Sequence, residues 1–83
     1  MNTRHRRTLA RIRARSTPPD MEWRDVAGLL SALGARMTEG SGSRVRVELN
    51  GVRAVLHRPH PKRVLGRSMV RSLRDLLDQA GVE

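Results

Sequence analysis

The sequence predicts an α+β domain in which two helices cover one face of a three-stranded antiparallel sheet and leave the other face open. Two amphipathic segments with a period near 3.6 residues indicate the helices. Between them, apolar and polar residues alternate on both sides of Asn50-Gly51, which indicates a hairpin. We therefore expect a basic N-terminal arm over residues 1–19 and one α-β-β-β-α domain, a two-layer sandwich, over residues 20–83.

The composition narrows the classes of protein that the chain can belong to. It has 83 residues, which make one small domain, and no cysteine, so disulfides and thiolate zinc sites are excluded. No apolar run approaches the length of a membrane span, and no nucleotide-binding or zinc-protease motif occurs. We expect no metal, no cofactor and no membrane contact.

The net charge points to a polyanionic partner. The chain carries +9, with 17 basic against 8 acidic residues, and every basic residue except Lys62 is an arginine. Arginine offers a planar fork of donors that suits phosphate, and strongly basic small proteins bind polyanions by releasing counterions. Trp23 is the only aromatic residue, which disfavours a platform of several stacked bases.

The arm contains six arginines and no acid. Leu9 and Ile12 are spaced for one face of a short helix, and Pro18-Pro19 ends whatever forms. The arm either orders on a partner or docks on the protein itself through Leu9 and Ile12.

The first helix of the domain is predicted from apolar residues at helical spacing, namely Trp23, Val26, Ala27, Leu30 and Leu33. Asp20 precedes it as a candidate cap, and Gly34 fits the left-handed residue that closes a helix. At this spacing we expect Trp23 to pack in the core. Residues 35–39 follow as a short strand.

The hairpin has a specific predicted register. A type I′ turn at Asn50-Gly51 pairs Leu49 with Val52, and the same register directs six apolar side chains to the core face. The opposite face then carries three pairs, namely Glu48 with Arg53, Arg46 with Val55, and Arg44 with His57. The last is a non-hydrogen-bonded pair, the kind whose side chains lie closest.

The closing helix is predicted from Met69, Leu73, Leu76, Leu77 and Ala80. Arg71 with Asp75 and Arg74 with Asp78 have the i, i+4 spacing of helical ion pairs, and Gly81 ends the helix.

Several short motifs, in this order, resemble a known family. A helix ending in ALGA, then EGSGSRVRV, a hairpin, HRPHP and a closing DQAGV resemble the HicA toxins over residues 21–83. These are small ribonucleases of bacterial toxin–antitoxin pairs, with a fold related to the double-stranded-RNA-binding domain (dsRBD-like). The arm resembles the extension of a longer-armed branch. The resemblance implies metal-independent cleavage of mRNA in the cytoplasm and a cognate HicB-like antitoxin that covers the active face.

The sequence departs from the family at one position. The family signature is Gly-Ser-His, with a catalytic histidine, whereas Gly42-Ser43 is followed here by Arg44. Arginine stays protonated and cannot act as a base. We therefore predict that His57, across from Arg44, transfers the proton, and that Arg44 and Arg46 bind the scissile phosphate.

His60 is the second candidate for proton transfer, because its place resembles the family's histidine after the third strand. The alternative is that His57 and His60 are simply exposed strand-end and loop residues. Further RNA contacts are expected from the polar residues around these positions, namely Ser43, Arg53, Arg58, Lys62 and Arg63.

Three functions fit these residues. The first is a toxin that cuts mRNA and blocks translation. The second is a non-catalytic RNA-binding module of the same fold. In the third, the basic face mainly binds an acidic antitoxin, in a complex that sits on operator DNA through that antitoxin.

Overall fold

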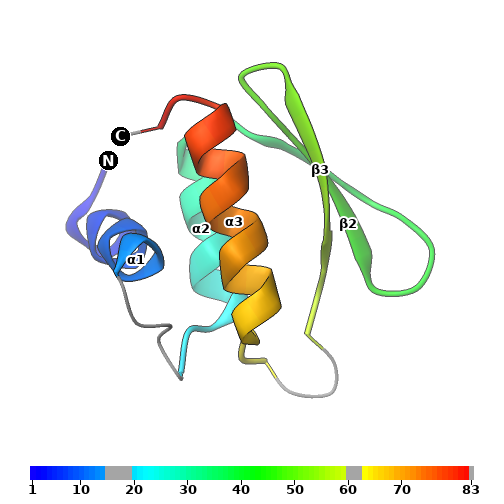
Figure 1. Ribbon diagram of the computed structural model, residues 1–83, viewed down its shortest axis with the longest axis horizontal. Coiled ribbons are helices and arrows are strands. Elements are labelled where there is room, and N and C mark those ends of the chain that lie inside the picture. The colour runs from blue at the N-terminus through cyan, green and yellow to red at the C-terminus, as the bar shows by residue number, and fades with distance from the viewer. Residues whose placement is uncertain (15–19, 60–62, 83) are drawn as a thin grey trace.

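The computed structural model describes residues 1–14, 20–59 and 63–82. Its elements follow the order α1 (Thr3–Arg13), α2 (Trp23–Ala32), β1 (Arg36–Glu39), β2 (Arg44–Leu49), β3 (Val52–His57) and α3 (Arg67–Gln79). Figure 1 shows α2 and α3 on one side of the sheet, with α1 on the other side of this helix pair. The predicted α+β fold is confirmed, and the arm contains an additional helix.

The sheet has the order β1-β2-β3 with both neighbouring pairs antiparallel. The hairpin register is the predicted one, from Leu49 opposite Val52 to Arg44 opposite His57. It is set by the turn, where Asn50 has φ 51° and Gly51 has φ 82°, as a type I′ turn requires. The Asn50 side-chain amide also donates to the Ala80 carbonyl oxygen over 2.8 Å, which fixes the turn to the end of α3.

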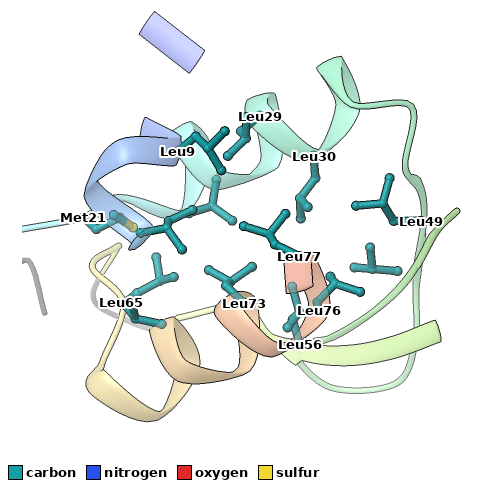
Figure 2. Packing of buried hydrophobic residues seen from close by; sticks show 14 of the residues in the cluster. Leu9, Met21, Leu29, Leu30, Leu49, Leu56, Leu65, Leu73, Leu76 and Leu77 are labelled. Carbon is teal, nitrogen blue, oxygen red and sulfur yellow. The ribbon is translucent and has the colours of Figure 1, made fainter. Parts of the chain in front are cut away.

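A single core lies between the sheet and the helices. Its buried side chains come from all three helices and from the inner faces of β2 and β3. Figure 2 shows Leu9 of α1 beside Leu29 of α2, with Leu73 and Leu77 of α3 below them. None of the described helices is both long and apolar enough to span a membrane.

Helix α1 docks on the protein's own core, which was one of the two alternatives for the arm. Asn2 caps its first turn by accepting from the His5 N–H over 2.8 Å. Thr8, Leu9 and Ile12 are buried against the other helices, and Ile12 has no exposed surface. The hydrophobic spacing of the arm therefore marks an internal packing face.

The C-terminal end of α1 is held by α3. The Arg74 guanidinium donates to the carbonyl oxygens of Ile12 and Ala14, and Arg13 pairs with Asp78 at 3.0 Å. The predicted Arg74–Asp78 pair is therefore wrong, because both of its members have partners at the end of α1, which local helical spacing cannot reveal. Arg71 and Asp75 form no ion pair among the described residues either.

The start of α2 also differs from the prediction. Asp20 pairs with Arg11 and does not cap α2, whose N-cap is Glu22 without a side-chain bond. Backbone hydrogen bonds join this segment to the residues that precede α3. The Trp23 N–H donates to the Arg63 carbonyl oxygen, and the Leu65 N–H donates to that of Met21, each over 2.9 Å.

Candidate functional site

The face of the sheet that points away from the helices (the open face) displays side chains in three rows. The middle row is Thr38, Arg46 and Val55, and the row nearest the hairpin turn is Arg36, Glu48 and Arg53. The third row, at the far end, is Arg44 and His57. Figure 1 shows no helix over this side of the sheet among the described residues.

Arg44 and His57 form the closest pairing that a sheet allows. Hydrogen-bonded positions flank them, because the Arg58 N–H donates to the Ser43 carbonyl oxygen over 2.7 Å just beyond the pair. They are therefore a non-hydrogen-bonded pair, with Cα atoms about 4.5 Å apart and both side chains on the open face. Both side chains are exposed.

Gly40 leaves room beside this pair. Its N–H donates to the Arg44 carbonyl oxygen over 2.8 Å, so it occupies the place on the β1 side where a third side chain would stand. A Cβ built at Gly40 would lie 3.7 Å from the Cβ of Arg44. The guanidinium of Arg44 and the imidazole of His57 are thus open to a ligand from that side.

The positive charge of the open face is unevenly neutralised. Near the turn, Glu48 lies between Arg36 and Arg53, and its Oε1 is 3.8 Å from the Arg53 Nε. At the other end, no carboxylate of the described residues pairs with Arg44 or Arg46. An anion is therefore attracted most strongly to the end that carries His57.

A shallow hollow of about 490 Å³ occupies the first two rows. Arg36, Thr38, Arg46, Glu48, Arg53 and Val55 contribute to its lining. Val55 is 54% exposed and provides apolar surface among the charged groups. Arg44 and His57 stand one row beyond its rim, so a polyanion lying in the hollow extends naturally to them.

Not all of the predicted RNA-binding residues share this face. Arg46 and Arg53 do, but Arg58 pairs with Glu39 at the end of the sheet and, with Arg63, lines a different hollow. Ser43 is exposed and its carbonyl oxygen is occupied by Arg58. His60 and Lys62 lie outside the described residues.

Two contributors were missed by sequence reasoning. The segment 35–39 was predicted as a strand without a register, so the place of Arg36 and Thr38 on the open face was not foreseen. Their alternation with Met37, which packs on the core, is the signal that could have placed them.

The chemistry available at this end is anion binding by arginine and proton transfer by one imidazole. Imidazole exchanges protons near neutral pH, whereas guanidinium does not. Within the described ranges, no group of three or more His, Asp or Glu side chains gathers as a metal site requires.

Comparison with known proteins adds one match. Residues 23–82 match the family model described as HicA toxin of bacterial toxin-antitoxin. The match spans α2, the sheet and α3, and does not include α1. No curated protein and no solved structure matches the chain.

Proposed function

Because the chain belongs to the HicA family of bacterial toxin–antitoxin toxins, we propose that it is an endoribonuclease that cuts mRNA on the open face of its sheet. The observation that carries this proposal is the pairing of Arg44 with His57 on that face. In this proposal Arg44 binds the phosphate and His57 transfers the proton, and Arg44 stands where the family signature has its histidine.

In the proposed reaction, Arg44 and Arg46 hold the scissile phosphate and stabilise the charge that grows on its oxygens. The His57 imidazole accepts the proton of the ribose 2′-OH, whose oxygen attacks phosphorus. The bond to the 5′-oxygen breaks, that oxygen takes up a proton, and a 2′,3′-cyclic phosphate remains. His60 is the second candidate for one of these proton transfers.

A toxin of this family works with an antitoxin partner. We propose that a HicB-like antitoxin covers the open face, because this face is exposed and carries an excess of arginine. An acidic surface complements it and blocks RNA at the same time.

The proposal is tested by incubating the purified protein with RNA in the presence of a chelator. We expect cleavage by the wild type, none by His57→Ala, and greatly slowed cleavage by Arg44→Ala. Added imidazole should partly restore the His57→Ala variant, because the free base can enter the space that the side chain leaves. His60→Ala, tested beside them, measures the share of the second histidine.

His5→Ala is the matched control, since His5 lies on α1 and away from the open face. Its cleavage rate should equal that of the wild type. If RNA binds but is cut by none of these proteins, the non-catalytic RNA-binding module becomes the better interpretation. A gain of activity in Arg44→His would show that the arginine replaced a stronger catalytic group.

A further inference from the structure

A second, smaller hollow lies at the end of β3. It has a volume of about 150 Å³ and largely apolar walls, and its lining consists of Glu22, Trp23, Arg24, Arg58, Pro59 and Arg63. Trp23 packs against the core with part of its side chain and remains partly exposed with the rest. The expected core role of Trp23 thus accounts for only part of its surface.

Backbone hydrogen bonds fix the walls of this hollow. Trp23 is the first residue of α2, and its N–H donates to the Arg63 carbonyl oxygen over 2.9 Å. An isolated β-bridge between Glu22 and Val64 lies beside this bond. The Arg58 N–H is bonded to Ser43, which continues the ladder of β2 and β3. The hollow is therefore formed before any ligand arrives, which lowers the entropic cost of binding.

Along the chain, the hollow directly follows His57, which we propose as the proton-transfer group of the cleavage reaction. His57 is the last residue of β3, and Arg58 follows it. Because successive residues of an extended strand point to opposite faces, His57 faces the open side and Arg58 faces the helices. A strand of RNA that crosses the end of β3 therefore passes from His57 to this hollow.

The surroundings of the hollow combine an apolar surface with positive charge. Arg24 is paired with Glu22 at 3.1 Å, and Arg58 with Glu39, which lies outside the lining. No carboxylate in the described part of the chain pairs with Arg63. The rim is net positive, which suits a ligand with an apolar ring and a neighbouring phosphate.

Taking RNA cleavage on the open face as the premise, we propose that this hollow binds one unpaired base of the RNA, next to the cut site. The base stacks on Trp23, and Arg63 contacts the adjoining phosphate. The hollow is large enough for a single ring system and too small to take up a whole helix or strand of a partner. One aromatic residue is too few for a platform of stacked bases but is sufficient for one base.

The chain is well suited to a direct test, because Trp23 is its only tryptophan and it has no tyrosine. Tryptophan fluorescence of the full chain is titrated with a single-stranded RNA carrying 2′-O-methyl groups, which cannot be cut. Anisotropy of the same RNA, labelled at one end, reports binding independently. We expect the RNA to quench the fluorescence with the same dissociation constant that anisotropy gives. An oligomer without bases should bind more weakly and leave the fluorescence unchanged.

A pair of variants separates stacking from packing. Trp23→Leu keeps apolar volume but removes the ring, and it should weaken binding by about 5- to 140-fold, the usual effect of losing one stacked base. Leu33→Ala is the control, because Leu33 is also partly buried and stands at the other end of α2. Its affinity for RNA should stay close to that of the wild type.

The outcomes separate this proposal from the cleavage proposal. RNA that binds by anisotropy without changing the fluorescence overturns the base site and leaves cleavage unaffected. If the 2′-O-methyl RNA quenches the fluorescence but the same RNA with free 2′-hydroxyl groups is never cut, the base site is supported and the nuclease activity is ruled out. Quenching only by an added antitoxin, with no RNA bound, overturns both.

Discussion

Helix α1 and the open face of the sheet both display arginines, but their guanidinium groups have different partners. In α1, Arg4 pairs with Asp25 at 2.9 Å, Arg11 with Asp20 and Arg13 with Asp78. On the open face, the described residues offer one carboxylate, Glu48, which lies among the arginines near the turn.

The difference shows that a count of basic residues overstates the positive surface that is available to a polyanion. The arm carries six arginines, yet three of them contact carboxylates of α2, α3 and the segment between α1 and α2. Exposed ion pairs add little stability one by one, so α1 is held mainly by its buried side chains. The open face has fewer arginines, but among the described residues only Arg53 of its four pairs with a carboxylate.

The largest expected effect comes from the buried face of α1. Ile12→Ala removes a side chain with no exposed surface and should lower the free energy of unfolding by about 2–5 kcal/mol. That is a large share of the stability of a small domain. Urea denaturation measures it, and Arg7→Ala, exposed on the same helix, should change the value by less than about 0.5 kcal/mol. Equal effects of the two variants would mean that α1 does not dock as described.

A smaller loss is expected where α3 holds the end of α1. Arg74→Ala removes the donors to the carbonyl oxygens of Ile12 and Ala14, and should cost about 1.5–3 kcal/mol, the usual value for hydrogen bonds to a charged group. Arg71→Ala, one turn earlier and exposed, is the matched control. RNA affinity of the folded Arg74→Ala protein should not change, and a loss of affinity would place this arginine at the RNA.

The salt dependence of RNA binding compares the two regions directly. The double variant Arg44→Ala/Arg46→Ala should have a shallower slope of the logarithm of the RNA-binding constant against the logarithm of the salt concentration. The slope should fall by about 0.7 for each phosphate of a single strand that the protein no longer neutralises. The double variant Arg4→Ala/Arg13→Ala removes two positive charges from α1 and should leave the slope unchanged, because both guanidinium groups already pair with carboxylates. Equal changes in slope would assign the RNA to both regions.

Local patterns were sufficient for the elements and for the hairpin register. Asn50-Gly51 and the alternation around it specify which side chains face outward, and the structure has Arg44 opposite His57 as that pattern predicts. The failed Arg74–Asp78 pair involves partners far apart in the sequence. The hydrogen bond from Arg74 to Ile12 spans 62 residues, and no local spacing encodes it.

The same limit applies to the hollow at Trp23. Its walls come from three separate segments, and the helical spacing of Trp23 indicated core packing alone. Neither Arg58 nor Arg63 has a local pattern that would place it beside an indole ring. The sequence therefore predicted the pair on the open face, whereas the second hollow required the three-dimensional arrangement.

The smallest effect tests how closely α1 lies on α2. A Cβ added at Gly28 would lie 3.2 Å from the His5 Cε1 atom, which is tighter than ordinary contact. The His5 Nδ1 is buried there without a hydrogen-bond partner among the described residues. Alanine is more favourable than glycine in a helix by about 0.8–1.0 kcal/mol. Gly28→Ala should therefore stabilise the protein by this amount only when the His5 imidazole, which the new Cβ would meet, is absent.

We therefore expect Gly28→Ala to change the free energy of unfolding little in the wild type and to raise it by most of that amount in a His5→Ala background. Urea denaturation of the four proteins measures the difference as a coupling between the two positions. If the gain were the same in both backgrounds, His5 would not lie on Gly28, and the N-terminal half of α1 would be held by Arg4 and Asp25 alone. A coupling of the expected sign shows that α1 packs along its full length, with its N-terminal turn as well as with Leu9 and Ile12.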